Sequence, residues 1–122
     1  MARARNSGDR KKFLRASRDI EYAKRRGRRL STRLYNLLIC RTDSLDTRVG
    51  IVVGKRFGLA VRRNRAKRLF RELTRRFYRQ FAAGYLLLVF PKRDALGVSF
   101  ETLQDSWSSI LRRQGVLESH EG

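Results

Sequence analysis

The chain has 122 residues, with 30 Lys or Arg against 11 Asp or Glu, so its formal net charge is +19 and its pI is about 11.6. This length fits one domain with a modest core, and a hydrophobic fraction of 41% excludes a wholly disordered basic tail. A charge of this size exceeds what solubility needs and destabilises the compact state by self-repulsion. It therefore predicts a polyanionic partner.

The sequence offers few groups for catalysis or metal binding. With one cysteine, Cys40, and one histidine, His120, it provides neither an internal disulfide nor a Cys/His metal cluster. The acidic residues are scattered, and none forms a convincing pair of catalytic carboxylates. We therefore predict no catalytic centre and no metal held by the protein itself. Cys40 lies in an apolar run and is expected to be a buried thiol.

The sequence also lacks membrane signals. No stretch approaches the ~18 apolar residues of a membrane span, and residues 1–30 lack the apolar segment of a secretion signal. We expect a soluble cytoplasmic protein with no membrane partner.

The N-terminal half predicts a basic arm, a helix and two strands. Residues 1–13 are expected to be disordered, and residues 17–27 to form a short helix that Gly27 ends in the left-handed conformation. The apolar residues 33–41 predict a strand. After the turn-forming TDSLD, alternation in residues 47–57 predicts a second strand, paired with the first as a hairpin.

The C-terminal half begins with a long basic helix, expected at about residues 60–81. Its apolar residues recur at helical spacing and form one stripe. The members of this stripe are Ala66, Leu69, Phe70, Leu73, Phe77 and Phe81. The run YLLLVF, residues 85–90, is bounded by Gly84 and Pro91 and predicts an interior strand. Ser99 is expected to cap a final helix.

The predicted order is helix, strand, strand, helix, strand, helix. This order indicates the α+β class, with helices packed on a small mixed sheet. We expect a single domain over residues 14–116 and a loose C-terminus over residues 117–122.

The basic helix is unusual in the sign of its charges. Between Arg62 and Arg71, six of ten residues are Arg or Lys. Cations four apart, such as Lys67 and Arg71, destabilise an isolated helix by a few tenths of a kcal/mol, and cations near a helix N-terminus oppose its dipole. Arginine predominates, as expected where a planar group must bridge phosphate oxygens. The pattern favours a phosphate-binding face over the merely solvated face that most charged helices present.

The segment RVGIVVGKRFGLAVRRNRAKRLFREL, Arg48 to Leu73, resembles the signature of the protein subunits of bacterial ribonuclease P. The residues that match the family pattern, with every spacing kept, are Gly54, Lys55, Arg56, Gly58, Ala60, Val61, Arg63, Asn64, Arg65, Lys67, Arg68, Arg71 and Glu72. A weaker likeness extends from about Phe13 to Arg113. The resemblance thus covers most of the chain.

The resemblance implies a fold and an activity. The fold would be a four-stranded mixed sheet, with one short strand beyond those predicted above and an unusual left-handed βαβ crossover around the basic helix. The protein would bind the catalytic RNA of ribonuclease P and the 5′ leader of precursor tRNA. It would assist the Mg²⁺-dependent endonucleolytic removal of the leader that produces the mature 5′ end of the tRNA.

The resemblance also implies how the work is divided between protein and RNA. The protein would be a subunit of an endoribonuclease whose catalytic centre and Mg²⁺ belong mainly to the RNA, so that the protein alone is inactive. No protein partner is predictable from the sequence. The single domain would be an RNA-binding domain.

Site residues follow from the matched positions. Residues expected to bind the catalytic RNA are Arg62, Arg63, Asn64, Arg65, Lys67, Arg68, Arg71 and Arg75. Residues expected near the leader are Lys55, Arg56, Lys24, Ile20, Leu38 and Arg33. Of these, Ile20, Lys24 and Leu38 occupy positions where the family usually has leader-facing aromatic residues. The residues expected to anchor the basic helix to the sheet are Ala60, Val61, Leu69, Phe70 and Leu73.

Two other functions fit the charge. The size and charge also suit a ribosomal or other structural RNA-binding protein. DNA binding through a recognition helix is a weaker alternative, because the basic helix lacks the short preceding helix and turn of the usual motif.

Overall fold

The computed structural model describes residues 17–118, with side chains described from Ile20 onward. Its helices and strands are α2 (Ser17–Arg26), β1 (Arg28–Ser31), β2 (Tyr35–Arg41), β3 (Arg48–Ile51), α3 (Ala60–Phe77), β4 (Tyr85–Pro91) and α4 (Phe100–Arg113). Short 3-10 turns span Lys55–Phe57, Tyr78–Gln80 and Arg93–Gly97. The arm expected at 1–13 and most of the expected C-terminal tail lie outside the described residues. Leu117, which was included in that tail, is buried and forms a bridge with Phe81.

The four strands form one mixed sheet in the order β1-β2-β4-β3. β1 pairs with β2 and β2 with β4 in antiparallel fashion, whereas β3 and β4 are parallel. The α+β class and the four-stranded mixed sheet are therefore confirmed. β3, α3 and β4 form the expected βαβ unit, and the left hand of its crossover stays a prediction.

The predicted hairpin is wrong, because β4 lies between β2 and β3. The side chains of β4 are buried from Tyr85 to Val89, so this apolar strand takes the interior position. The strand that lies next to β2 both along the chain and in the sheet is instead β1. Its sequence, RRLS, is basic and gave no clear strand signal. β3 has only four residues. After it, the Val52 N–H still bonds to the Val89 carbonyl at 2.9 Å before the chain leaves the sheet.

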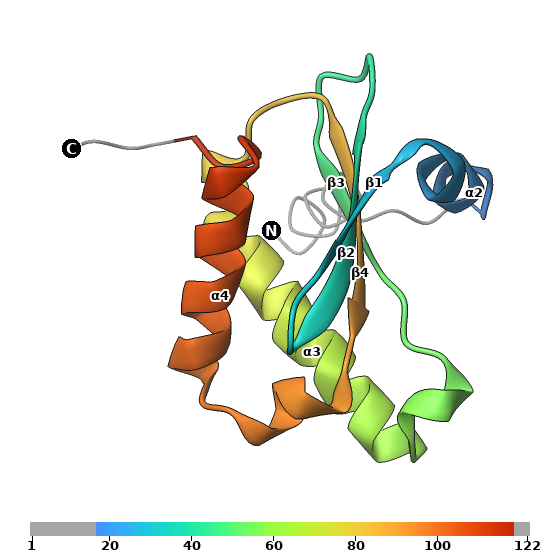
Figure 1. Ribbon diagram of the computed structural model, residues 1–122, viewed down its shortest axis with the longest axis vertical. Coiled ribbons are helices and arrows are strands. Elements are labelled where there is room, and N and C mark those ends of the chain that lie inside the picture. The colour runs from blue at the N-terminus through green and yellow to red at the C-terminus, as the bar shows by residue number, and fades with distance from the viewer. Residues whose placement is uncertain (1–16, 119–122) are drawn as a thin grey trace, which may run out of the picture.

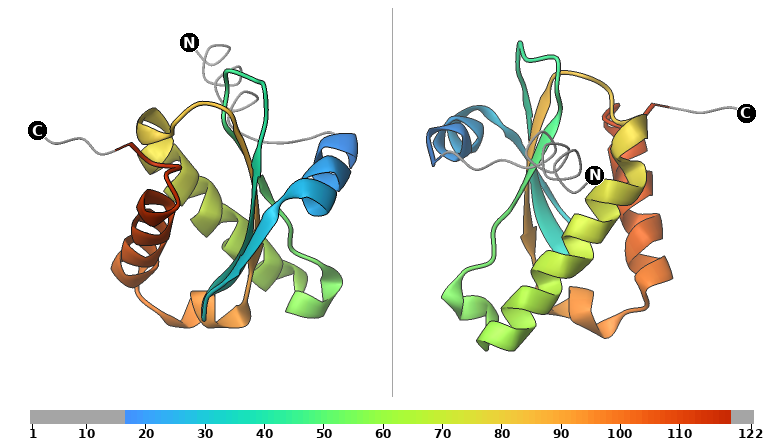
Figure 2. Two further views of the ribbon diagram at one scale, coloured as in Figure 1. Left: turned by 45° about the horizontal axis from the view of Figure 1, so that its top comes forward. Right: turned by 180° about the vertical axis from the view of Figure 1, so that it is seen from behind.

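One face of the sheet packs against α3 and α4 (Figures 1 and 2). At its centre, Tyr35, Phe70 and Trp107 form a triangle of edge-to-face contacts, with ring centroids 5.6 to 5.7 Å apart. Such contacts contribute about 0.5–1.5 kcal/mol each beyond the area they bury. The Tyr35 hydroxyl, 3.0 Å from Ser106 Oγ, also links β2 to α4. This aromatic triangle fixes both helices on the sheet.

The other face of the sheet carries α2. Ala23 of α2 packs against a smaller buried cluster that includes Leu38, Cys40, Leu86 and Leu88. Cys40 is 3% exposed, as predicted. Burial raises the pKa of its thiol, and the nearby charge of Arg26 lowers it to a lesser degree.

α3 is held by fewer residues than the sequence predicts. Ala66, Phe70 and Leu73 are fully buried, but Val61 is 68% exposed and Ala60 is also exposed. At about 100° per residue, Val61 lies nearly opposite the centre of the buried stripe, so it cannot contact the sheet. The helix also ends at Phe77 and continues as a 3-10 turn, rather than running to Phe81.

The last helix begins as expected. The Ser99 side chain accepts a hydrogen bond from the Thr102 N–H at 3.1 Å, which satisfies one of the free donors at the start of α4. No helix in residues 17–118 is long and apolar enough to span a membrane.

Gly27 serves a different purpose from the one predicted. It does not have positive φ. Its N–H bonds to the Ala23 carbonyl at 2.7 Å, and a Cβ at this position would lie 2.6 Å from the same oxygen. Glycine is needed here because the backbone approaches itself closely where α2 turns into β1.

We expect Gly27→Ala to lower the free energy of unfolding by about 1–3 kcal/mol, since the overlap involves backbone and can be relieved only by shifting α2. Urea denaturation of the full chain would measure this change in the free energy of unfolding. The control is Gly54→Ala, where nothing lies within 4 Å and φ is −86°; its stability should be unchanged or slightly higher. Equal stability of the two variants would contradict this account.

Candidate nucleic-acid interface

The cations of α3 divide into two flanks around its buried stripe. At about 100° per residue, Arg62, Arg65 and Arg68 lie on one flank, which faces the turn at Arg93–Gly97. The opposite flank carries Arg63, Lys67 and Arg71. Asn64 and Arg75 point between the flanks, away from the sheet, and both are exposed. The eight residues predicted to bind RNA therefore lie on one helix but do not form a single row.

The first flank lines a hollow of about 660 Å³, here called the basic groove. Its lining residues are Phe57, Val61, Arg62, Arg65, Arg68, Arg93, Leu96 and Gly97. The groove thus combines an apolar floor with four guanidinium groups. The exposed Val61, which fails as an anchor, contributes to this floor.

Two arginines brace the loop that leads into α3. Arg93 donates through Nε to the Phe57 carbonyl at 2.8 Å and through Nη2 to the Arg56 carbonyl at 3.0 Å. Arg63 donates to the Gly58 carbonyl at 2.8 Å. Gly58 has a φ of 144°, which other residues rarely adopt. Arg63 therefore has a structural role in this loop besides any contact with RNA.

Arg93 was not found from the sequence. It lies in the run PKRD after the interior strand, outside every motif that the sequence singled out. It reaches the basic groove because β4 ends beside the start of α3, and this proximity depends on the parallel pairing of β3 with β4.

The positive charge of the groove has no counter-charge among the residues that the structure describes. Arg62, Arg65 and Arg68 form no ion pair with residues 20–118, and the first turn of α3 contains no acidic residue. Further along the helix, Glu72 pairs with Arg76 at 3.0 Å. The N-terminal half of α3 is therefore the part best suited to an anion.

A second hollow, of about 520 Å³, lies between α2 and the sheet and is here called the α2 cleft. Its lining residues are Lys24, Arg29, Leu30, Ser31, Asn36, Leu37, Leu38 and Phe90. Two of the six residues predicted near the leader, Lys24 and Leu38, line this cleft.

The other four residues predicted near the leader lie elsewhere. Ile20 packs against the buried cluster beneath α2. Arg33 lies in the loop between β1 and β2, where it is 3.7 Å from Asp94 in an exposed ion pair. Lys55 and Arg56 are exposed on the braced turn before α3. The structure does not bring these four into the α2 cleft.

Phe90 is the aromatic residue of the α2 cleft, and it was not predicted from the sequence. It is half-buried and pairs in register with Asn36 of β2, so the two lie adjacent in the sheet. Alternation along β4 places Phe90 on the same face as Leu86 and Leu88, the face that carries α2. Alternation along β4 could have placed Phe90 on this face of the sheet. Its accessibility could be predicted only once it was known that α2 leaves part of that face uncovered.

In the part of the chain that the structure covers, no three His, Cys, Asp or Glu side chains lie together.

Comparison with known proteins gives a consistent relationship. Residues 9–115 match the family model described as Ribonuclease P. The chain is 34% identical over 114 residues to the ribonuclease P protein component of Thermotoga maritima, covering 93% of this chain and 95% of that protein. Against the corresponding protein of Finegoldia magna it is 29% identical over 100 residues, covering 82% and 88%.

Solved structures agree with this relationship. The ribonuclease P protein from Thermotoga maritima superposes with a TM-score of 0.74 at 30% identity, covering 84% of this chain and 96% of that chain. A mutant of the Staphylococcus aureus ribonuclease P protein, described as defective in mRNA degradation, has a TM-score of 0.83 at 23% identity, covering 93% and 96%. The second comparison shows the shared fold. The family model spans most of the sequence, and the chain therefore belongs to the protein components of bacterial ribonuclease P.

Proposed function

We propose that this protein binds the catalytic RNA of ribonuclease P through α3 and holds the 5′ leader of precursor tRNA in the α2 cleft. The observation that carries the proposal is the basic groove, whose arginines have no acidic partner among the described residues. The bound protein would assist Mg²⁺-dependent cleavage that releases the leader and leaves the mature 5′ end of the tRNA. A cytoplasmic ribonucleoprotein follows from these partners.

Phosphate binding explains the arrangement of α3. A guanidinium group can donate two parallel hydrogen bonds to a phosphate, and these are stronger than bonds between neutral groups. Arg62, Arg65 and Arg68 are exposed, and no described residue competes for them as an ion-pair partner. The apolar floor of the groove, including Val61 and Leu96, can contact sugars or bases between the phosphates. If about six phosphates are engaged, log K should fall against log salt with a slope of roughly −4 to −5.

The α2 cleft suits a single strand of RNA. Phe90 offers apolar contact to a base, Asn36 offers an amide, and Lys24 and Arg29 offer positive charge at the edge. Stacking of a base on an aromatic side chain contributes about 1–3 kcal/mol and tolerates any base. We infer that Phe90, on β4, takes the stacking role that leader-facing aromatics perform elsewhere in the family.

Mg²⁺ is expected to be bound mainly by the partner RNA. Mg²⁺ keeps several waters and is usually bound by one or two carboxylates together with substrate phosphates, which a catalytic RNA and its substrate supply in number. This chain's own residues would contribute by binding and orienting RNA, and by adding positive charge near phosphates that the metal must approach. We expect no cleavage by the protein alone.

The direct test mixes the protein with its cognate catalytic RNA and leader-bearing precursor tRNA at low Mg²⁺. The protein should increase cleavage at the mature 5′ end, while protein without the RNA should cleave nothing. Unchanged cleavage would overturn the proposal. Co-sedimentation with ribosomal subunits that survives high-salt washing would then favour a structural role in the ribosome.

The basic groove gives a second prediction. Replacing Arg65 and Arg68 by Ala should weaken binding to the catalytic RNA and flatten the salt slope by about two units. Filter binding at several salt concentrations would measure it. Both side chains are exposed, so the fold should be unaffected. Replacing the exposed Arg112 and Arg113 of α4 removes the same charge outside the groove and should change the slope much less.

The α2 cleft gives a third prediction. Phe90→Ala should weaken the affinity of the assembled complex for leader-bearing precursor tRNA by about 5- to 150-fold, because one base loses its stacking surface. Affinity for tRNA without a leader, and for the catalytic RNA, should be unchanged. Phe90→Trp should retain binding. An equal loss for both tRNAs, or no loss, would show that Phe90 does not contact the leader.

A further inference from the structure

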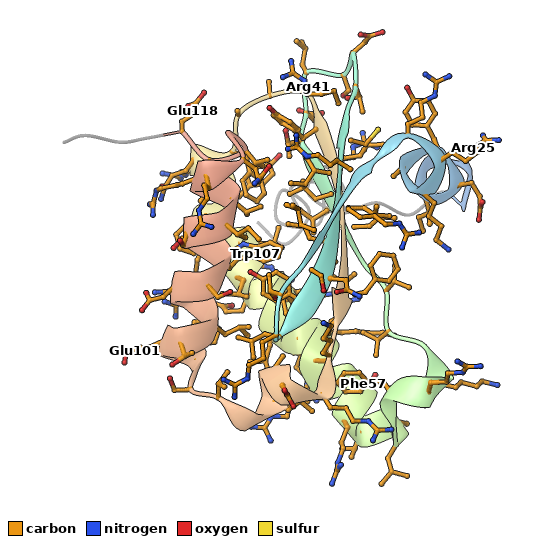
Figure 3. All side chains as sticks on the ribbon, in the orientation of Figure 1. Arg25, Arg41, Phe57, Glu101, Trp107 and Glu118 are labelled. Carbon is orange, nitrogen blue, oxygen red and sulfur yellow. The ribbon has the colours of Figure 1, made fainter. Side chains whose placement is uncertain are left out.

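A separate group of cations lies at the end of the sheet remote from the basic groove. It contains three arginines and two tyrosines and is here called the arginine–tyrosine cluster: Arg26, Arg28, Arg41, Tyr22 and Tyr85. These side chains border an open hollow of about 480 Å³. Figure 3 shows Arg41 at one end of the molecule and Phe57, which lines the basic groove, at the other.

Aromatic rings hold two of the three guanidinium groups. The Arg41 Cζ lies 4.8 Å from the centroid of the Tyr85 ring, and its Nη1 donates to the Tyr85 hydroxyl at 3.1 Å. The Arg26 Cζ lies 5.3 Å from the centroid of the Tyr22 ring. Contacts of this kind restrict where a guanidinium group lies but leave its charge in place.

The third guanidinium also has a neutral partner. Arg28, the first residue of β1, donates through Nη2 to the side-chain oxygen of Gln114, at the end of α4. Each arginine can offer five N–H donors. Arg28 and Arg41 each use one in this way, so most of their donors stay available.

No counter-charge from the described residues reaches the cluster. Across residues 20–118, Arg26, Arg28 and Arg41 form no ion pair. The Cys40 thiol also lines the hollow, but burial raises its pKa, so it is uncharged at neutral pH. Asp46 lines an adjoining hollow, together with another arginine, Arg48.

This arrangement is costly without an anion. Three positive groups around one hollow repel one another, and the neutral partners do nothing to offset that repulsion. The same partners reduce the conformational freedom that the side chains would lose on binding, so a ligand gains affinity from the preformed arrangement. A group with several negative oxygens, such as a phosphate, matches the paired N–H donors of arginine.

We propose that the arginine–tyrosine cluster binds phosphate groups of an RNA strand, at a site distinct from the basic groove and beyond the α2 cleft. The inference rests on the proposed RNA-binding function. Strand β1 joins the two places, since Ser31 and Arg29 line the α2 cleft and Arg28 belongs to the cluster. Three strand residues span about 10 Å. Side chains alternate along each strand, so Arg28 and Arg41 lie on the opposite face of the sheet from Arg29 and Ser31. An RNA strand that leaves the cleft therefore reaches them around the free edge of the sheet at β1.

The test replaces Arg26, Arg28 and Arg41 together by Gln in the full chain. Two affinities are measured over a range of salt: that of the protein for the catalytic RNA, and that of the assembled complex for precursor tRNAs with short and long leaders. One of them should weaken, with a salt slope flatter by about two to three units. A loss in the first assigns the phosphates to the catalytic RNA. A loss confined to the long leader assigns them to the leader.

Unchanged affinity in both measurements overturns the proposal. The variant with Arg65 and Arg68 replaced is measured in parallel. If this variant loses affinity and the triple Gln variant does not, only the cluster proposal fails. If neither variant loses affinity, the proposed function fails as well. Should the triple variant unfold, Arg28→Gln alone removes an exposed side chain whose one hydrogen-bond partner among the described residues is Gln114, and it should flatten the slope by about one unit. Replacing the exposed Arg112 and Arg113 of α4 by Gln is the control, and it should change both slopes much less.

Discussion

Uncompensated positive charge is the constraint on which this structure depends. A net charge of +19 opposes compaction, so the fold must gain its stability from packing. A small number of residues supply this packing. Phe70 and Trp107 pack on Tyr35 and fix α3 and α4 to one face of the sheet, and Ala23 packs α2 on the other face. The core is therefore a support that keeps cations in fixed positions, and an anionic partner relieves the repulsion that the core alone must resist.

Not every arginine serves the same purpose. Arg63 and Arg93 spend donors on backbone carbonyls and hold the loop before α3. Arg76 bonds to Glu72 and lies 4.9 Å from the centroid of the Phe100 ring, so it fastens α3 to α4. Once these are set aside, Arg62, Arg65 and Arg68 remain in the basic groove with exposed side chains and no ion-pair partners among the described residues. Charge density along a sequence overstates the number of groups free to bind a ligand.

The sequence allowed prediction of what depends on local pattern, and it failed where distant segments meet. Helical periodicity located α3, and Ser99 correctly indicated the start of α4. The position of β4 between β2 and β3 depends on long-range pairing, for which alternation within one strand gives no information. For the same reason, the sequence did not predict the roles of Phe90 and Arg93. The accessibility of Phe90 depends on how much of the sheet α2 covers, and Arg93 meets α3 only through the parallel pairing of β3 and β4.

The placement of the three basic surfaces bears on how the protein would distinguish its RNA. The basic groove and the arginine–tyrosine cluster lie near opposite ends of the molecule, as Figure 3 shows for Phe57 and Arg41, and residues of β1 line both the α2 cleft and the cluster. Contacts to phosphates carry no sequence information individually. A fixed spacing between the three surfaces does distinguish one RNA from another, because only an RNA whose backbone passes all three can bind them together. Each surface that is bound raises the effective concentration of the RNA at the next. Shape, rather than base sequence, is then the property that the protein selects.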